Sequence, residues 1–151
     1  MRNVDTALAQ VVDLAEKGPL RKEFTRWAFI DISGAFNNLK TEMALSAMRD
    51  RGFPEHLGSW YGSFVTNRIA NSVVLGSKAK RRLHLGTPLG GVISPLCWNV
   101  PMNELLELLN ECEGITGIGF SDDLAILINS IDELTLSDLM QKALNEAQPW
   151  L

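Results

Sequence analysis

The sequence has little of what a disulfide framework or a transition-metal site requires. It contains two cysteines, Cys97 and Cys112, and two histidines in 151 residues, with no Cys-x-x-Cys pair. Neither cysteine has a histidine at the spacing of a zinc site. We therefore expect two free thiols, buried or partly buried, in a reducing compartment.

Long apolar runs and leader-like segments are also missing. The start, Met1-Arg2-Asn3-Val4-Asp5, lacks the apolar core of a signal peptide, and no repeat or low-complexity tract follows. No uncharged stretch approaches the roughly 20 apolar residues that a membrane helix needs. We expect an intracellular protein of the cytoplasm, the nucleus or both, which is not secreted and has no membrane partner.

The composition that is present fits one globular domain. Hydrophobic residues make up 46% of the chain and charged residues 21%. A domain of this length buries about 70% of its unfolded surface. The net charge of -4 does not favour nucleic-acid binding through overall electrostatics.

One cationic run stands out against that balance. Lys78, Lys80, Arg81 and Arg82 fall within five residues, and His84 follows. Two interpretations have similar weight: a charged hairpin edge that resists aggregation, or a contact with a nucleic-acid backbone.

Hydrophobic periodicity predicts a mixed order of helices and strands. The expected helices are 4–17, stopped by Gly18-Pro19, 38 to about 52, one opened by Pro54, 94 to about 109, and 134–148; the expected strands are 27–32, buried on both faces, 69–75, 80–85, 115–120 and 124–128. This order favours an α+β fold with helices packed on one face of a largely antiparallel sheet.

Three aspartates sit where buried strands are expected to end. Asp31 follows the apolar run 27–30, and Asp122-Asp123 interrupts the second apolar hairpin. A charge beside a core costs several kcal/mol unless it is paired or coordinates a cation, and adjacent aspartates repel each other. A divalent cation resolves both problems, and hard Mg²⁺ prefers carboxylates.

That chemistry suits two-metal phosphoryl or nucleotidyl transfer. Asp31 and Asp122 are 91 positions apart, so the hypothesis requires adjacent strands. A helix cap for Asp31 and a solvated turn for the doublet are the structural alternatives. The segment 86–95 adds three glycines, two prolines and a helix start, which allow close backbone approach and favour phosphate groups.

Together these segments resemble the palm motifs of reverse transcriptases. Residues 29–37, 86–95 and Phe120-Ser121-Asp122-Asp123 are similar, in order, to the first three motifs. Trp98-Asn99 and the flanking segments 2–8 and 136–150 resemble the enzymes of non-LTR (LINE-type) retrotransposons. The resemblance implies that 1–151 is a partial reverse transcriptase domain, a palm with part of the fingers, without the thumb and most of the fingers.

The resemblance also implies a function and a site. It implies RNA-directed DNA polymerase activity, which transfers a nucleotide from a dNTP to a DNA primer 3′-OH on an RNA or DNA template. Asp31 and Asp122 would bind two Mg²⁺ ions, for which Mn²⁺ can substitute, and Asp123 would complete the acidic cluster. The Ile32 carbonyl would be a further ligand.

The remaining motif residues would contact the nucleotide and the template. Ser33, Gly34 and Ala35 would line the triphosphate, and Phe36 would block a ribose 2′-OH, unless it is an ordinary core aromatic. The loop Gly86, Thr87, Pro88, Leu89, Gly90 and Gly91 would pack near the nascent base pair.

Some positions depart from the family pattern. Leu89 stands where glutamine is usual, which removes a polar contact, and Pro101 falls inside a predicted helix at a cost of about 3 kcal/mol or a kink. Without a thumb, the isolated chain is expected to bind template and primer weakly and to polymerise little. The alternatives are an inactive retroelement remnant or co-opted scaffold that acts through protein contacts, and a small Mg²⁺-dependent phosphohydrolase.

Overall fold

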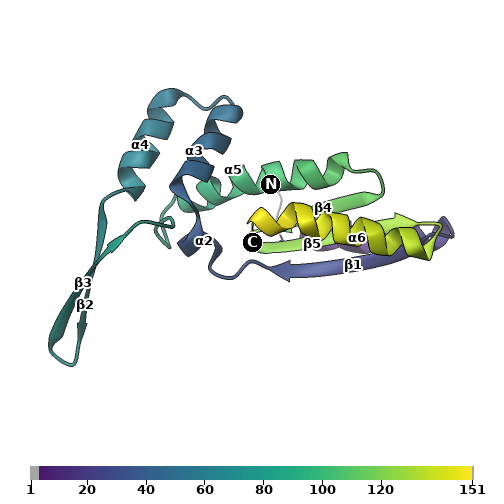
Figure 1. Ribbon diagram of the computed structural model, residues 1–151, viewed down its shortest axis with the longest axis horizontal. Coiled ribbons are helices and arrows are strands. Elements are labelled where there is room, and N and C mark those ends of the chain that lie inside the picture. The colour runs from purple at the N-terminus through teal and green to yellow at the C-terminus, as the bar shows by residue number, and fades with distance from the viewer. Residues whose placement is uncertain (1–3, 151) are drawn as a thin grey trace. The chain divides into compact units, whose positions relative to one another are not determined.

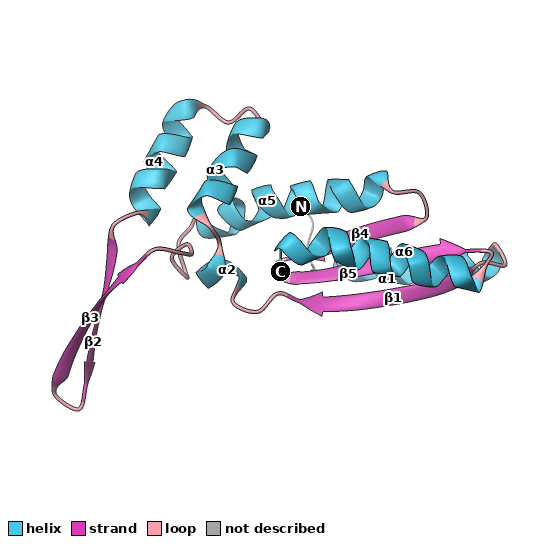
Figure 2. Cartoon of the chain, in the orientation of Figure 1, coloured by secondary structure: helices cyan, strands magenta, loops and turns pink. Residues whose placement is uncertain are grey.

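The computed structural model describes residues 4–150, so the expectation for Arg2 lies outside the described residues. Figures 1 and 2 show helices mixed with antiparallel strands, which confirms the α+β class. In chain order the elements are α1 (Val4–Leu20), β1 (Phe24–Asp31), α2 (Ala35–Asn38), α3 (Thr41–Asp50), α4 (Glu55–Val65), β2 (Arg68–Val74), β3 (Ser77–Leu83), α5 (Ser94–Glu111), β4 (Ile115–Phe120), β5 (Asp123–Ser130), α6 (Glu133–Ala147) and a 3₁₀ turn (Gln148–Trp150).

The chain forms two compact units. Residues 4–33 and 102–150 make the first, here called the sheet unit, and Gly34–Pro101 makes the second, the hairpin unit. The boundary runs through α5 directly after Pro101. The predicted flaw at Pro101 does not end this helix, which continues for ten residues beyond it. Both cysteines are free, as predicted.

The sheet unit is built around β5. Its three strands are antiparallel in the order β1-β5-β4, and residues 124–128 of the central strand are all buried. Gly117 of β4 lies under Leu109 of α5, and Arg26 of β1 donates a hydrogen bond of 2.7 Å to Ser137 of α6. Since these strand positions share a face, α5 and α6 cover the same side of the sheet.

Helix α1 lies over the other face. It continues through Gly18 and Pro19 to Leu20, so the predicted stop is wrong. Gly18 packs so tightly on the Thr25 side chain that a Cβ at this position would collide with it. Thr25 alternates with Trp27, Phe29 and Asp31 on one side of β1, which places all four on the face of α1.

Strand β1 is an edge strand, and the prediction that it is buried on both faces is wrong. Phe24, Phe29 and Asp31 are exposed, and the exposed fraction of Phe29 is 71%. Apolar content alone predicted a central strand, but the strand with neighbours on both sides is β5.

In the hairpin unit, α3 and α4 pack closely and a long hairpin follows them. Leu45 of α3 lies against Gly58 and Gly62 of α4, where an added Cβ would be in ordinary van der Waals contact with the leucine side chain. Strands β2 and β3 pair antiparallel and extend away from the helices of their own unit (Figure 1). Val74 pairs with Ser77, so Leu75-Gly76 forms the turn, in place of the predicted Gly76–Ala79.

Candidate active site

The first and third sequence motifs meet at one end of the sheet unit. In the register of β1 and β5, Asp31 lies directly opposite Asp123. Directly opposed residues of an antiparallel pair point to the same face, with Cβ atoms about 4.5–5.5 Å apart. Beyond the pair, the Ile32 N–H donates to the Asp122 carbonyl over 3.0 Å. Two segments 91 positions apart are thus held side by side.

The turn between β4 and β5 determines which aspartate faces Asp31. Phe120 pairs with Asp123, so Ser121 and Asp122 alone form the turn. Ser121 has a φ of 56°, in the left-handed region. Such a conformation costs a residue with a Cβ roughly 1–2 kcal/mol. The expected partner of Asp31 was Asp122, whereas the ladder places Asp123 opposite it.

The structure brings together an acidic pair and not an acidic triad. Asp31 and Asp123 are exposed, and Asp122 is half-buried in the turn. Within residues 4–150, no three side chains of histidine, cysteine, aspartate or glutamate converge in a way that could hold a metal ion. The structure thus places two exposed carboxylates, those of Asp31 and Asp123, on one face at this end of the sheet.

A cavity of about 420 Å³ adjoins the acidic pair on the face of α1. Its lining combines Asp31 and Asp123 with apolar side chains from the helix and the sheet: Val4, Ala7, Leu8, Val11, Phe29, Ile30, Ile118, Phe120, Leu124 and Ala125. Trp27 stacks on Phe29 with ring centroids 5.6 Å apart and planes 3° from parallel. The acidic pair thus lies at the edge of a largely apolar cavity.

Sequence reasoning missed this cavity. The helical spacing of Val4, Leu8 and Val11 predicts an amphipathic helix, and in the structure Leu8 is 60% exposed. The sequence signal for an apolar surface here was the pair Trp27 and Phe29, which are two positions apart and therefore lie on the same face of a strand. Nothing in the sequence indicated that α1 would lie opposite them.

The expected nucleotide-binding segment spans the boundary of the two units. Ile32 is buried and Ser33 exposed in the sheet unit, and Gly34 opens the hairpin unit with a φ of 66°. Ala35 is buried in α2. The half-buried Phe36 ring lies 6.1 Å from the Trp98 ring at a tilt of 45°, so it packs as part of the hairpin unit.

The glycine-rich loop 86–91 docks on the backbone at the end of the first motif and directly after it. The Gly86 N–H donates to the Leu39 carbonyl over 2.8 Å, and the Thr87 N–H donates to the Phe36 carbonyl over 2.7 Å. Gly86 has a φ of 82°, and a Cβ there would lie 2.5 Å from the Asn37 carbonyl oxygen. The end of the first motif, from Gly34 onward, and the second motif are therefore packed together within the hairpin unit.

Buried polar side chains form hydrogen bonds within and beside this loop. The Thr87 and Ser94 hydroxyls lie 2.9 Å apart, and Ser94 donates to the Pro88 carbonyl over 2.6 Å. Since the Ser94 proton is used there, Thr87 is the donor between the two hydroxyls. The Tyr61 hydroxyl of α4 is buried beside Thr87 and Cys97 without a well-formed hydrogen bond, and burial raises its pKa to about 12. Burial also raises the pKa of the Cys97 thiol.

The tip of the loop and the cationic run are exposed. Leu89, at the position where the resemblance leads one to expect glutamine, is 69% exposed, and Gly90 beside it has a φ of 79°. The cations at 78, 80, 81 and 82 are all exposed on β3.

None of the helices described between residues 4 and 150 is both long and apolar enough to cross a bilayer.

Comparison with known proteins gives consistent matches. The family described as reverse transcriptase (RNA-dependent DNA polymerase) matches residues 7–151. The chain is 26% identical over 133 residues to a 115 kDa protein ascribed to the retrotransposable element R1DM of Drosophila melanogaster, a match that covers 88% of the chain and 13% of that protein.

Two further relatives come from mobile elements. The RNA-directed DNA polymerase of the Drosophila melanogaster element jockey is 28% identical over 149 residues, which is 95% of the chain and 16% of that protein. The Pol polyprotein of the element R2 of Popillia japonica is 27% identical over 110 residues, which is 65% of the chain and 18% of that protein. The chain thus spans less than a fifth of each relative.

Proposed function

We propose, because this chain belongs to the reverse transcriptase family, that it supplies the palm of an RNA-directed DNA polymerase of a non-LTR retrotransposon. The reaction transfers a nucleotide from a dNTP to a primer 3′-OH on an RNA or DNA template. The observation that supports this most directly is the cross-strand pairing of Asp31 with Asp123 beside the cavity under α1.

The acidic pair fits a divalent cation in its chemistry and its placement. Carboxylate oxygens are the ligands that Mg²⁺ prefers, and Mn²⁺ accepts the same donors. Asp31 and Asp123 are exposed on one face of adjacent strands, so both can bind the same ion. A bound cation would stabilise negative charge on the phosphate oxygens. We propose two ions for the working site, with Asp122 as a further ligand and the Ile32 carbonyl beside it.

The protein's own residues would bind and orient the nucleotide. The backbone of Ser33, Gly34 and Ala35 would line the triphosphate, because Gly34 has no Cβ to prevent close approach. Phe36, supported by the Trp98 ring, would exclude a ribose 2′-OH. The loop 86–91 would hold the nascent base pair through its fixed backbone rather than through base-specific contacts.

A scaffold that acts through protein contacts is the second candidate function. It is favoured by the lack of a three-carboxylate cluster within residues 4–150 and by the exposed Leu89 in place of a polar residue. If the chain is a scaffold, variants that neutralise Asp31 and Asp123 should keep the fold. They should also bind the same protein partners as the unaltered chain.

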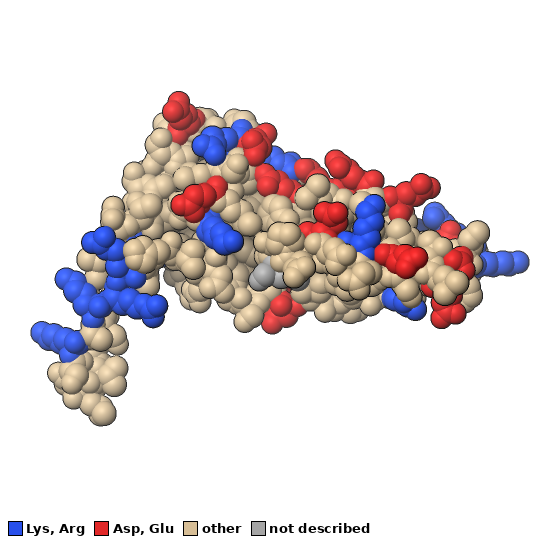
Figure 3. Space-filling view, viewed as in Figure 1, with Lys and Arg blue, Asp and Glu red and all other residues tan. Residues whose placement is uncertain are grey.

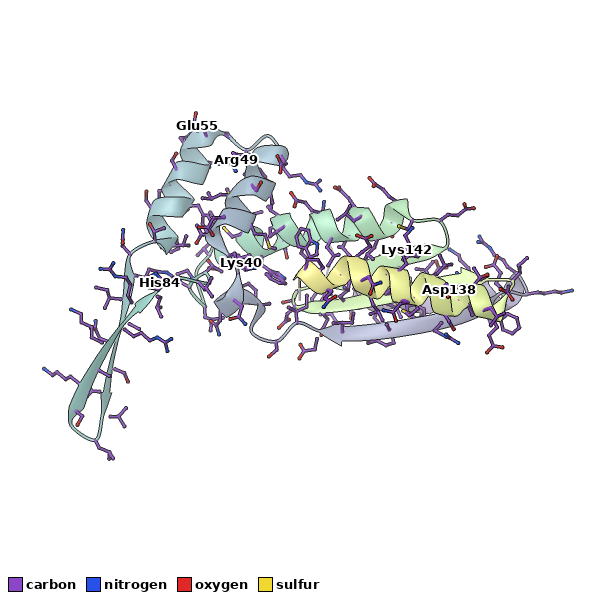
Figure 4. All side chains as sticks on the ribbon, viewed as in Figure 1. Lys40, Arg49, Glu55, His84, Asp138 and Lys142 are labelled. Atoms are coloured by element: carbon purple, nitrogen blue, oxygen red, sulfur yellow. The ribbon has the colours of Figure 1, made fainter. Side chains whose placement is uncertain are left out.

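Primer extension with matched variants tests the proposal. Asp31→Asn and Asp123→Asn are compared with Asp138→Asn, an exposed aspartate of α6 labelled in Figure 4. Using an RNA template, a DNA primer and Mg²⁺ or Mn²⁺, we expect each site variant to lower extension at least 100-fold and the control to leave it unchanged. Because the isolated chain is expected to polymerise little, the comparison is made at a chain concentration at which the unaltered chain gives measurable extension. Extension that survives in both site variants refutes the assignment, and a loss in Asp138→Asn as large as in the site variants contradicts it as well.

A further inference from the structure

The β2–β3 hairpin carries positive charge that no acidic residue in its part of the chain offsets. No aspartate or glutamate occurs between Glu55 and Glu104, a stretch that holds five cations: Arg68, Lys78, Lys80, Arg81 and Arg82. The chain as a whole has a net charge of -4. Figure 3 shows the blue side chains of lysine and arginine gathered along the hairpin with no red ones among them. Charge of one sign is therefore concentrated on this element.

The strand register arranges three of these cations in a row. Lys78, Lys80 and Arg82 are two residues apart along β3, so their side chains share one face of the hairpin. At about 3.4 Å per residue the row is about 14 Å long. A nucleic-acid strand has a phosphate about every 3.4 Å along the helix axis, so the row spans roughly four phosphate spacings.

These cations have no structural task within the described residues. Lys78, Lys80, Arg81 and Arg82 form no ion pair with any carboxylate between residues 4 and 150. Arg68 differs, because it donates to the carbonyls of Val65, Leu85 and Gly86 at the base of the hairpin. The base is thus anchored, while the cationic row stays in solvent.

The hairpin also has no core of its own. Only Arg68 and Leu83, at its base, are even partly buried. A two-stranded hairpin exposed on both faces is marginally stable in water. Charged side chains protect a strand edge from aggregation whatever their sign. That role does not require charges of a single sign, nor charges aligned on one face of the hairpin. A regular polyanion accounts for both the single sign and the row.

We propose that the β2–β3 hairpin is a nucleic-acid backbone clamp, in which Lys78, Lys80 and Arg82 contact phosphates of one strand. This inference rests on the proposed polymerase function in one respect: that function identifies the polyanion as a nucleic acid. Asn71, opposite Lys80 on the same face, adds a hydrogen-bond donor for a phosphate oxygen. Such contacts bind without reading the base sequence.

Salt-dependent binding tests the clamp. The triple variant Lys78→Gln, Lys80→Gln, Arg82→Gln is compared with Arg21→Gln, Arg49→Gln, Lys142→Gln, which removes the same charge from exposed positions elsewhere. The ligand is a fluorescent 20-base-pair RNA·DNA hybrid, and the dissociation constant is measured by anisotropy between 50 and 200 mM KCl. Each lost phosphate contact lowers the slope of log K against log salt by about 0.9 on a duplex.

We expect the hairpin variant to lose about 2 to 3 units of slope and at least tenfold in affinity at 50 mM KCl. The control triple should change the slope by less than one unit, and replacement by Lys78→Arg, Lys80→Arg should retain the binding. Equal losses in both triples overturn the clamp, because they would reflect net charge alone.

Two further measurements distinguish the clamp from a membrane contact and from a defect at the acidic pair. Phosphatidylserine vesicles replace the hybrid in a second series, and a loss of vesicle binding without a loss of hybrid binding overturns the proposal in favour of a membrane contact. Mn²⁺ binding is measured on the same variants. The clamp predicts that the hairpin variant binds Mn²⁺ as well as the unaltered chain does. Failure of the clamp would therefore change hybrid binding alone, whereas failure of the acidic pair would appear in Mn²⁺ binding.

Discussion

Replacement of Gly86 by alanine tests how the loop 86–91 is held. An L-residue at a φ of 82° costs roughly 1–2 kcal/mol. The new Cβ would also lie 2.5 Å from the Asn37 carbonyl oxygen and 2.7 Å from that of Phe36. Both neighbours are backbone atoms, which cannot rotate away as a side chain can. Movement would weaken the hydrogen bonds of Gly86 and Thr87, each worth about 1 kcal/mol.

These effects together predict a loss of about 3–5 kcal/mol in the free energy of unfolding. Urea unfolding at 25 °C measures it, with Gly90→Ala as the matched control. Gly90 has a similar φ of 79°, but a Cβ there would meet nothing within 4 Å. The control should therefore lose only about 1–2 kcal/mol. Equal losses in the two variants would refute the argument that the loop is docked on backbone at Gly86.

Two predictions follow from shifted pKa values. Tyr61 is the one tyrosine in the chain, so its absorbance near 295 nm should titrate at about pH 12 in the folded state and near pH 10 after unfolding. Because the folded state favours the neutral phenol, the free energy of unfolding should be unaffected below pH 10 and should fall by about 2–3 kcal/mol toward pH 12. An equal fall in Tyr61→Phe would contradict this prediction. Asp132 caps α6 by accepting from Thr135, whose hydrogen bonds lower the Asp132 pKa. Its contribution should be lost as the pH falls below about 4, and Asp132→Ala should remove that acid step from helix unfolding measured by circular dichroism.

Local patterns predicted most of the elements of this fold. The alternation around Ser121-Asp122-Asp123 predicted the second hairpin, and Gly52 and Pro54 predicted the break between α3 and α4. Burial was predicted less well. The apolar run of β1 resembles a central strand, but its exposure depends on having one neighbour in the sheet, which no local pattern encodes.

The candidate site was predictable in its parts but not in its register. The required adjacency of Asp31 and the acidic doublet is present between β1 and β5. Which aspartate faces Asp31 depends on a shift of a single residue, and such a shift moves every side chain to the other face. Ser121 in the left-handed region makes the turn two residues long and puts Asp123 opposite Asp31. A serine at that position gives no sequence signal for this conformation.

The central claim is that Asp31 and Asp123 bind the same cation, and a double-mutant cycle of Mn²⁺ binding tests it most directly. Electron paramagnetic resonance measures free Mn²⁺ with the unaltered chain, Asp31→Asn, Asp123→Asn and the double variant. If one ion is shared, each single variant should lose at least tenfold in affinity, and the double variant should lose little more than the weaker-binding single one. Losses that simply add, or a single variant that binds Mn²⁺ as well as the unaltered chain, would contradict the account.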